Sequence, residues 1–357
     1  MLTFHNLTLR RRHTLCDDAV CLEFEAPADA SGRYGFQAGQ HLSFRAVIDG
    51  AEIRRSYSIV SPPDGALRVG VRLQGRMSRY LANDLPIGGT IEAMEPAGRF
   101  RAAPSAADGT PRSYVAFAAG SGITPVLSIV TDLLERDRQT SVRLFYGNRT
   151  LARTMFLEEL LSLKNRFLGR LAIQFIMSGE PQDVDVFNGR LDADRVRRLA
   201  QTDFDVAAVD EFFVCGPGSM VRGVIDTLRA LGAPGKIHFE RFSADTAESV
   251  PAQAMVDAPA ASGATDVGVT ITLDGRRRRF EMRRGELVLE AAERAGIALP
   301  FSCRAGVCST CRVQVTSGAV AMDRNQALED WEISAGYVLC CQARPVSDQV
   351  DLNYDNL

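Results

Sequence analysis

Hydrophobic and polar residues alternate in short runs through the N-terminal part of the chain. The runs 20–24, 42–48 and 67–73 are separated by turn sequences, among them Asp49-Gly50 and Pro62-Pro63-Asp64-Gly65. Alternation with a period of two is typical of half-buried strands, and many short strands joined by turns favour a closed antiparallel sheet. We therefore predict an antiparallel β-barrel over residues 1–105.

From about residue 113 the pattern changes to continuous apolar runs that alternate with amphipathic helical stretches. The apolar runs are 114–119, 142–146, 171–176 and 211–215. Strands that are buried on both faces have this composition, and helices between them indicate a parallel sheet covered on both sides. The pattern predicts an α/β doubly wound domain over residues 106–243.

The segment 244–265 is rich in Ala, Ser, Asp and Pro and contains no aromatic residue. Because such a composition can bury little apolar surface, we interpret it as a linker. A third domain follows over residues 266–357. It begins with an alternating run that ends at Asp274-Gly275, and a helix is predicted over 286–295 with Gly296 as its C-cap.

Charge and hydropathy exclude two classes of partner. The 357 residues include 41 Lys+Arg and 44 Asp+Glu, a net charge of −3, which gives no basic surface for nucleic acid. The longest apolar stretch, 114–130, is interrupted by Gly and Pro and does not resemble a membrane span. The chain starts Met-Leu-Thr-Phe-His without a basic-then-apolar signal region, so we expect a cytoplasmic protein.

The eight cysteines are unevenly distributed, and five of them fall between positions 303 and 341. Cys303, Cys308 and Cys311 follow a C-x4-C-x2-C spacing with further cysteines at 340 and 341, which is the arrangement that holds a plant-type [2Fe–2S] cluster. A zinc site or a set of buried thiols is the alternative, but zinc ligands usually come as two closely spaced pairs. The run 337–342 is predicted to be a strand, so only one of the two adjacent cysteines can face the loop. Cys16 and Cys21 are expected to pack as small hydrophobic residues.

The predicted barrel contains two segments suited to a flavin nucleotide. Arg55-Ser-Tyr57-Ser58 follows a strand, and Gly75-Arg-Met-Ser78 opens a helix. An arginine and a helix N-terminus are suitable partners for a pyrophosphate. A tyrosine can pack along a flavin ring, and a serine hydroxyl can bond near its reactive nitrogen.

Four segments of the predicted α/β domain carry candidate ligand residues. The first three follow strands at the edge where doubly wound sheets bind ligands, and the fourth closes the domain just before the linker. They are Gly120-Ser-Gly-Ile-Thr-Pro125, Tyr146-Gly-Asn-Arg-Thr150, Cys215-Gly-Pro-Gly-Ser-Met220 and His238-Phe-Glu-Arg-Phe242. The first is a G-x-G-x-T-P turn rather than the standard G-x-G-x-x-G fingerprint. The second contains no acidic residue for a ribose 2′-hydroxyl, whereas Arg149 can meet a 2′-phosphate or remain solvated.

In these segments the chain resembles the ferredoxin–NADP reductase superfamily over residues 1–243. The resemblance implies that Arg55 contacts phosphate, Tyr57 packs on the isoalloxazine and Ser58 bonds near its N5. The rest of the flavin is then held by Val71, Arg72, Met77 and Ser78. It favours FAD, although some oxygenase reductases of the superfamily use FMN.

The same resemblance implies the nucleotide site and the catalytic residues. Gly120, Gly122, Thr124 and Pro125 are expected at the pyrophosphate of the dinucleotide. The nicotinamide is expected beside Cys215, Gly216 and Met220, and the flavin beside Glu240 and Phe242. The expected catalytic set is Ser58, Cys215 and Glu240, with Glu240 as a proton or charge partner. With Arg149 at the ribose, NADPH is preferred to NADH.

From residue 267 to its end the chain resembles the plant-type ferredoxins, on the run Leu299-Pro-Phe-Ser-Cys303 through Cys311 and on Val338-Leu-Cys-Cys341. The resemblance implies an α+β domain of the β-grasp type. It makes Cys303, Cys308, Cys311 and Cys341 the ligands of the cluster, and Cys340 the outward neighbour of Cys341.

The order of the three domains implies an electron path. A nicotinamide gives up two electrons as a hydride and a [2Fe–2S] cluster accepts one, so a flavin belongs between them. The whole chain is similar to the reductase subunits of the phenylacetyl-CoA epoxidase family, in segments such as Glu52-Ile-Arg-Arg-Ser-Tyr-Ser and Ile237-His-Phe-Glu-Arg-Phe. That resemblance implies transfer from NADPH through FAD and the cluster to a di-iron oxygenase subunit in another chain. A steroid, alkane or aromatic hydroxylase is the alternative acceptor.

Overall fold

The structure is a computed structural model that describes residues 4–103, 110–242, 252–256 and 266–356. The backbone divides into two compact units, an N-terminal unit over Phe4–Ser243 and a C-terminal unit from Ala244 onward. No helix in these described ranges is both long enough and apolar enough to cross a membrane.

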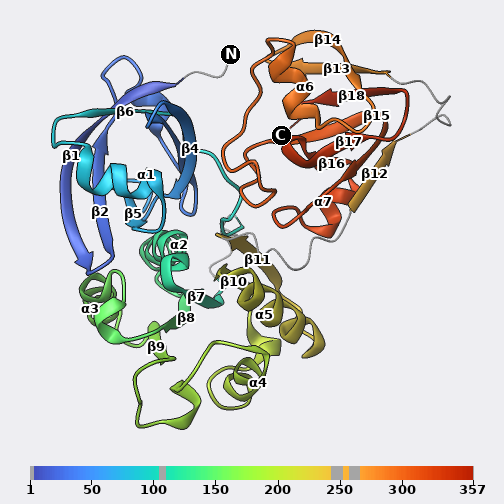
Figure 1. The fold of residues 1–357 in the computed structure, drawn as a ribbon. Coiled ribbons are helices and arrows are strands. Elements are labelled where there is room, and N and C mark those ends of the chain that lie inside the picture. Colours follow the sequence, from blue (N-terminus) through green and yellow to red (C-terminus); the bar gives the residue numbers. More distant parts are fainter. Residues whose placement is uncertain (1–3, 104–109, 243–251, 257–265, 357) are drawn as a thin grey trace. The chain divides into compact units, whose positions relative to one another are not determined.

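The first half of the N-terminal unit is an antiparallel sheet (Figure 1). It has six strands in the order β4-β3-β6-β1-β2-β5. Its strands are β1 (His5–Cys16), β2 (Ala19–Glu25), β3 (His41–Ile48), β4 (Ala51–Ser58), β5 (Leu67–Arg72) and β6 (Thr90–Ala93). A bridge between Ile59 and Val69 joins the chain after β4 to β5, so the two ends of the sheet meet. The predicted antiparallel barrel is confirmed, and a short helix α1 (Arg76–Arg79) follows β5.

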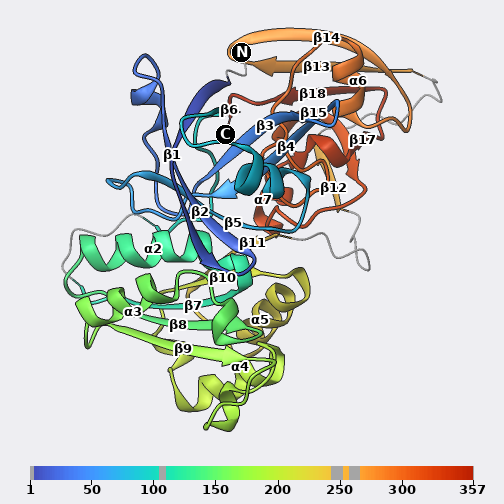
Figure 2. The same cartoon turned by 60° about the vertical axis from the view of Figure 1, so that its left-hand side comes forward.

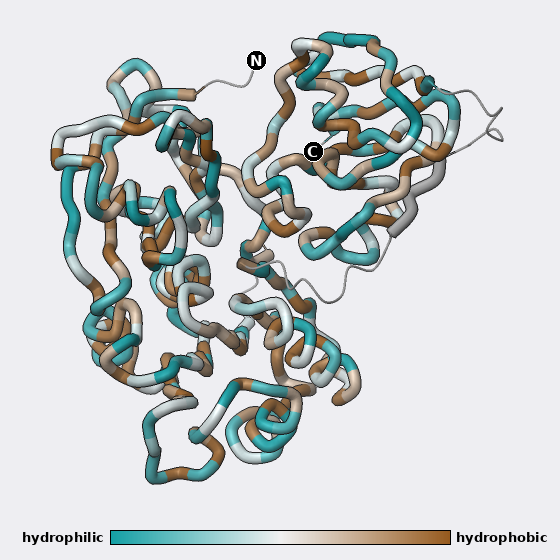
Figure 3. Tube along the Cα trace, in the orientation of Figure 1, coloured by the Kyte–Doolittle hydropathy of each residue, from teal (hydrophilic) through white to brown (hydrophobic). Residues whose placement is uncertain are grey.

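The alternating residues of the barrel strands point into its interior, as their pattern predicts. Leu22, Phe24, Leu42, Phe44 and Val69 are all buried in one hydrophobic cluster. Hydrophobic segments recur along the strands of both units in Figure 3.

The second half of the N-terminal unit is a five-stranded parallel sheet between two layers of helices (Figure 2). Its strands are β7 (Ser113–Ala119), β8 (Ser141–Asn148), β9 (Leu171–Met177), β10 (Glu211–Gly216) and β11 (Lys236–Arg241), and its helices are α2 (Ile123–Arg136), α3 (Leu157–Arg166), α4 (Ala193–Thr202) and α5 (Gly218–Ala230). Tyr114 and Ala116 of β7 pack in a cluster with α2 and α3, whereas Val115 and Phe117 pack with α4 and α5. Burial on both faces explains the continuous apolar runs, and the predicted α/β fold is confirmed.

In the strand order β11-β10-β7-β8-β9, the chain adds strands first on one side of β7 and then on its other side. The chain moves outward from β7 through β8 to β9 and then returns to place β10 on the other side of β7. Ligands of doubly wound sheets bind at such a reversal, outside the carboxyl ends of the strands. The segments after β7 and β10 therefore frame the expected nucleotide site.

The C-terminal unit is a mixed sheet of seven strands with helices packed against it. Its elements are β12 (Ala252–Val256), β13 (Asp266–Leu273), β14 (Arg276–Arg283), α6 (Val288–Arg294), β15 (Arg312–Met322), α7 (Asp330–Ser334), β16 (Tyr337–Leu339), β17 (Ala343–Pro345) and β18 (Gln349–Asn353). β13 pairs with β18 in parallel and with β14 antiparallel, while α6 buries Val288, Leu289, Ala291 and Ala292. This is the α+β domain expected from the sequence.

The structure corrects two details of the sequence analysis. Residues 252–256 form β12, which pairs with β15, so this part of the segment interpreted as a linker belongs to the C-terminal sheet. The remainder of 244–265 lies outside the described residues. The predicted strand 337–342 ends at Leu339, and Cys340–Gln342 form a 3-10 turn before β17. The pairing of β15 with both β16 and β17 accounts for the break, because the chain must pass from one pairing segment to the next.

Candidate functional site

The residues predicted to hold the flavin meet where the two ends of the barrel sheet come together. Ser58 ends β4 and is 4% exposed, while Tyr57 beside it is partly buried with its ring centroid 5.9 Å from that of Phe44. Val71 and Arg72 end β5, the strand that bridges to the residue following Ser58. Arg55 is exposed on β4. The structure thus brings these residues from two separate segments to one side of the barrel.

Ser78 of α1 has a local structural role. Its hydroxyl accepts hydrogen bonds from the backbone N–H groups of Gln74 and Gly75, at 3.0 and 2.9 Å, and donates to the carbonyl of Gly75. These bonds shape the turn that leads into the helix, and Met77 beside it is buried in the barrel core.

The glycine turn after β7 packs directly against the end of β10. A Cβ atom on Gly122 would lie 2.2 Å from the carbonyl oxygen of Cys215, so only glycine fits there. Gly120 has a φ of 54° and its carbonyl accepts a hydrogen bond of 2.9 Å from the hydroxyl of Tyr146. Thr124 donates to the carbonyl of Ser121 at 2.9 Å, and Pro125 is the third residue of α2. The predicted G-x-G-x-T-P and C-G-P segments are therefore neighbours in space.

A cluster of buried polar groups lies where the barrel meets the parallel sheet. Cys215 of β10 and Glu240 of β11 are neighbours in the parallel register. On the barrel side, His41 of β3 faces Ser58 of β4 across the antiparallel pair. Nδ1 of His41 lies 4.0 Å from Oε1 of Glu240, so residues from both halves of the unit meet here.

Burial controls the protonation of this cluster. It raises the pKa of Glu240 to about 8 and lowers that of His41 to about 4, and it raises the pKa of the Cys215 thiol, to which the Glu240 charge adds. In the described part of the chain Oε2 of Glu240 is enclosed without a hydrogen-bond partner. A carboxyl group that is neutral near pH 7 can donate a hydrogen bond to a ligand atom or give up a proton. His41 was not identified from the sequence, because nothing there indicates its pairing with Ser58 or Glu240.

A cavity of about 870 Å³ opens at the carboxyl ends of the parallel strands. Its wall includes Gly120, Arg149, Gly216 and Met220, which are all predicted site residues, together with the predicted flavin neighbour Phe242. Arg149 is exposed at this wall. Because the volume suits a ligand of nucleotide size, the cavity is the candidate dinucleotide site.

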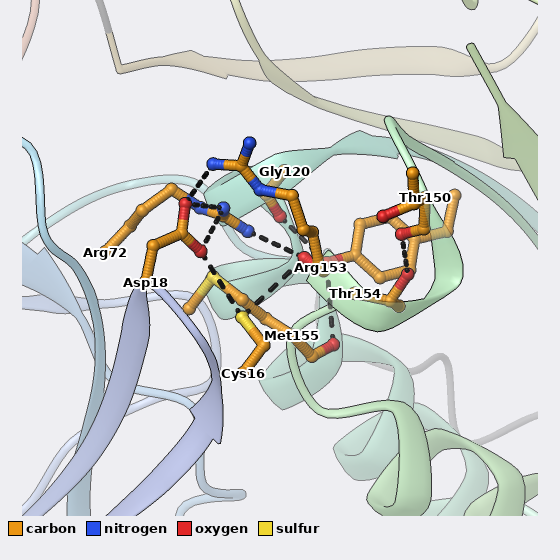
Figure 4. A network of polar contacts seen from close by, with 9 residues as sticks. Cys16, Asp18, Arg72, Gly120, Thr150, Arg153, Thr154 and Met155 are labelled. Atoms are coloured by element: carbon orange, nitrogen blue, oxygen red, sulfur yellow. Dashed lines mark hydrogen bonds and ion pairs between the residues drawn. The ribbon is translucent and has the colours of Figure 1, made fainter. Parts of the chain in front are cut away.

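An ionic network that no sequence pattern indicates lies in the wall of this cavity, and we name it the Asp18 cluster. It consists of Asp18, Arg72 and Arg153, which line the cavity, and of Cys16 beside them (Figure 4). Nη1 of Arg72 donates to both carboxylate oxygens of Asp18 at 2.7 Å, and Nη2 of Arg153 binds the same carboxylate. The Cys16 thiol, expected only to pack, also lies 3.4 Å from Oδ1 of Asp18. These residues come from three distant segments, so no sequence pattern connects them.

The four predicted cluster ligands meet at the loop 301–311 of the C-terminal unit. Cys311 and Cys341 are buried, while Cys303 and Cys308 are partly exposed. The thiols form two facing pairs, Cys303 with Cys308 and Cys311 with Cys341. A backbone N–H from Ala305 points at the Cys303 sulfur at 3.3 Å. The left-handed residues Arg304, Gly306 and Ser309 give the loop the curvature that turns its thiols to one side.

Each facing pair of thiols holds one cysteine whose pKa is lowered, Cys303 or Cys341, and one whose pKa is raised by the shared hydrogen bond and by burial, Cys308 or Cys311. The pKa of Cys303 is lowered, first of all by its hydrogen bond with Cys308, and that of Cys341 is lowered by its hydrogen bond with Cys311. Cys340 is fully buried in the domain core beside Tyr354, and burial raises its pKa to about 12. The 3-10 turn, rather than strand alternation, separates the directions of the two neighbouring thiols. The donor set, four thiol sulfurs with backbone N–H groups directed at Cys303 and Cys341, has the chemistry of ligands to an iron–sulfur cluster.

Three models of protein families match the three parts of this arrangement. An oxidoreductase FAD-binding domain matches residues 6–102, an oxidoreductase NAD-binding domain matches 117–226, and a 2Fe-2S iron-sulfur cluster binding domain matches 271–346. The chain is therefore an NAD(P)H-dependent oxidoreductase with domains for FAD, a nicotinamide dinucleotide and a [2Fe–2S] cluster.

Known proteins align with this chain along almost its whole length. A subunit of the 1,2-phenylacetyl-CoA epoxidase of Escherichia coli (strain K12) is 39% identical over 99% of both chains. The ferredoxin reductase component of 3-ketosteroid-9-alpha-monooxygenase of Mycolicibacterium smegmatis is 33% identical over 95% of this chain and 93% of that one. The chain belongs to this family of flavin- and NAD-dependent reductases with a C-terminal 2Fe-2S domain.

Solved structures show the same fold. Phthalate dioxygenase reductase, described as a modular structure for electron transfer from pyridine nucleotides to [2Fe-2S], covers 98% of both chains with a TM-score of 0.57 and 23% identity. An intact type IV self-sufficient cytochrome P450 monooxygenase matches 98% of this chain with 41% of its own length, at a TM-score of 0.69 and 21% identity. At these identities the likeness describes the fold alone.

Proposed function

We propose that this protein carries electrons from NADPH through FAD and a [2Fe–2S] cluster to the oxygenase component of a multicomponent monooxygenase. The observation that carries the proposal is that three cysteine thiols of the loop 301–311 meet the thiol of Cys341, in a chain that also holds a nucleotide-sized cavity beside a flavin-type barrel. A flavin accepts two electrons as a hydride and releases them one at a time, which links a nicotinamide to a one-electron cluster. We expect this transfer to take place in the cytoplasm.

On the flavin side, we assign Arg55 to the phosphate, Tyr57 to the ring face and Ser58 to the region of N5. The backbone around Val71, Arg72, Met77 and Ser78 holds the remainder of FAD. We place the buried Cys215 and His41 and the partly buried Glu240 beside this site, since Glu240 lies 4.0 Å from His41, the strand partner of Ser58. Glu240 stores a proton there because its carboxyl is neutral near pH 7. Burial also excludes water from the hydride path.

On the dinucleotide side, the glycine turn of Gly120 and Gly122 with Thr124 and Pro125 receives the pyrophosphate, and Gly216 and Met220 receive the nicotinamide. Phe242 lies at the wall of the same cavity. Arg149 meets the 2′-phosphate, which favours NADPH. In the C-terminal unit, Cys303, Cys308, Cys311 and Cys341 hold the cluster.

The assignment of the fourth ligand is tested by a pair of neighbouring substitutions. We expect Cys341→Ser to abolish the visible and EPR signals of the cluster while NADPH-dependent reduction of a flavin-accepting dye continues. Cys340→Ser, at the adjacent buried thiol, is expected to keep the cluster signals. If Cys341→Ser retains them and Cys340→Ser loses them, the ligand assignment is wrong.

For the acceptor we propose a di-iron oxygenase subunit that acts on phenylacetyl-CoA, because the relative of 39% identity is a subunit of an epoxidase for that compound. The alternative is the oxygenase of a steroid, alkane or aromatic hydroxylase. Two relatives of similar coverage are ferredoxin reductase components of a 3-ketosteroid-9-alpha-monooxygenase. The test is reconstitution with the purified oxygenase subunits of each system and measurement of product formed per NADPH consumed. Turnover with the steroid oxygenase alone would contradict the phenylacetyl-CoA assignment.

A further inference from the structure

The Asp18 cluster ties the barrel to the parallel-sheet domain. Asp18 lies in the turn between β1 and β2, Arg72 ends β5, and Arg153 belongs to the loop after β8 (Figure 4). Besides its contacts to the carboxylate, Arg72 donates from Nη2 to the backbone carbonyl of Arg153 at 3.0 Å. The side chains of Arg72 and Asp18 are only 12% and 24% exposed, so this is a partly buried ionic network.

The cluster carries more positive than negative charge. Burial opposes ionisation of Asp18, but the hydrogen bond from Arg153 and the charge of Arg72 outweigh it and lower the pKa of the carboxyl. One carboxylate therefore faces two guanidinium groups, which are always protonated, and a net charge of about +1 remains. A partly buried site with excess positive charge attracts an anion.

Two donors in the same wall have no acceptor. Over the described ranges, Nε of Arg72 and Nδ2 of Asn148 are buried without a hydrogen-bond partner. Both residues line the cavity together with Asp18, Arg153 and the glycine turn at Gly120. Buried donors normally have partners, so two orphan donors in one cavity indicate a ligand that supplies acceptor oxygens.

The remaining acid in the cavity does not compete for these donors. Asp192 lines the same wall, but its carboxylate accepts a hydrogen bond of 2.9 Å from the backbone N–H of Arg195 as the N-cap of α4. The excess positive charge of the Asp18 cluster is thus left for the ligand.

We propose that Asp18 positions Arg72 of the barrel and Arg153 of the parallel-sheet domain as a pair of guanidinium groups that binds the pyrophosphate of NAD(P)H. This inference rests on the proposed function, since it assumes that the cavity receives the dinucleotide. The glycine turn contacts the pyrophosphate through its backbone from one side, and the two arginines supply charge from the other. Because the arginines belong to different domains, the bound anion strengthens the contact between the domains.

A second ion pair of the same strand provides a matched control. Arg68 of β5 binds Glu159 of α3, with Nη2 and Oε2 2.7 Å apart, and therefore also joins the barrel to the parallel-sheet domain. Neither residue belongs to the lining of the cavity. Loss of this pair weakens the contact between the domains without removing charge from the cavity.

The experiment measures the dissociation constants of NAD⁺ and NADP⁺ on the FAD-loaded enzyme, from the perturbation of the flavin spectrum. We expect Arg153→Ala to raise both constants by about tenfold and by the same factor, because both dinucleotides carry the pyrophosphate. Arg153→Lys restores part of the affinity. Arg153→Ala keeps its flavin content, and Glu159→Gln leaves both dissociation constants and the rate of flavin reduction by NADPH unchanged.

Four outcomes would overturn the inference. Unchanged dissociation constants in Arg153→Ala mean that the arginine pair does not bind the dinucleotide. If Arg153→Ala weakens the binding of NADP⁺ but not of NAD⁺, the arginine pair binds the 2′-phosphate instead. If the variant loses its flavin, the pair binds FAD. If Glu159→Gln raises the dissociation constants as much as Arg153→Ala does, the Asp18 cluster acts only by holding the two domains together. Failure of the proposed function itself is distinct, because the wild-type enzyme would then show no flavin reduction by NADPH.

Discussion

Two arginines, one near the beginning of β8 and one directly after it, have different surroundings, and we expect the coenzyme preference to depend on the second. Arg149 lies at the wall of the dinucleotide cavity, whereas Arg143 is exposed on β8 and is not part of that wall. We expect Arg149→Ala to raise the KM for NADPH about tenfold more than the KM for NADH, because only NADPH has a 2′-phosphate for the guanidinium to bind. Steady-state kinetics with both coenzymes check this, with Arg143→Ala as the control. An equal effect on the two coenzymes would rule out a 2′-phosphate contact.

At the flavin side, the buried carboxyl of Glu240 gives the stability of the protein a predictable pH dependence. Its pKa is raised by burial from 4.5 to about 8, and the titratable groups that face it are His41 on β3 and Cys215 on β10. A group whose pKa is higher in the folded state contributes stability at low pH, and this contribution is lost as the pH rises through the folded pKa. The contribution of Glu240 therefore decreases between about pH 4.5 and about pH 8.

We accordingly expect the free energy of unfolding of the wild type to fall relative to that of Glu240→Gln across this window, by about 1.4 kcal/mol per pH unit at most. Denaturant titrations of both proteins at several pH values provide the measurement. His41 and Cys215 remain neutral over most of the window, so they contribute little to the difference. A difference that does not depend on pH would mean that Glu240 is not buried as the structure describes.

At the level of elements, the contact between the glycine turn and β10 depends on the absence of one methyl group. In Gly122→Ala the new Cβ would lie 2.2 Å from the carbonyl oxygen of Cys215, although the backbone of Gly122 has an ordinary φ of −59°. The clash separates the G-x-G-x-T-P turn from the C-G-P segment. We expect a loss of about 1–3 kcal/mol in stability, as for other overpacked interiors, and a higher dissociation constant for NADP⁺.

The matched control is Gly32→Ala, in the 3-10 turn Ser31–Tyr34, where an added Cβ meets nothing within 4 Å. That variant should differ from the wild type by no more than about 0.5 kcal/mol. Thermal or denaturant unfolding monitored by circular dichroism compares the two. Similar stability for both alanine variants would contradict the close approach of the turn to β10.

For the whole molecule, the division into two compact units predicts separate unfolding of the parts. Trp331 of α7 is the single tryptophan of the chain and lies in the C-terminal unit, whereas the flavin belongs to the N-terminal unit. Tryptophan fluorescence and flavin absorbance therefore report the two units independently. We expect Gly122→Ala to shift the flavin transition to lower denaturant concentration and to leave the Trp331 transition in place. Coincident shifts of both transitions would show that the chain unfolds as one cooperative unit.

The sequence by itself determined the architecture and the metal chemistry of this protein. Alternating runs at 42–48 and 67–73 predict exposed and buried faces of a barrel, and unbroken runs at 114–119 and 211–215 predict a sheet covered on both sides. The spacing of Cys303, Cys308 and Cys311 is equally informative, because C-x4-C-x2-C is one of the few spacings at which a short loop supplies three thiolates to one cluster. These signals are local or periodic, and both kinds can be read along a single chain.

Only the tertiary structure decided which distant side chains meet. The 3-10 turn at Cys340–Gln342, the pairing of β12 with β15, the contact of His41 with Glu240 and the Asp18 cluster all depend on strand pairing or on domain contact. Asp18 and Arg153 are separated by 135 positions, and no periodic pattern connects them. Ion pairs of this kind form when folding brings together segments that are individually polar, so their partners become visible only once the two domains are in place.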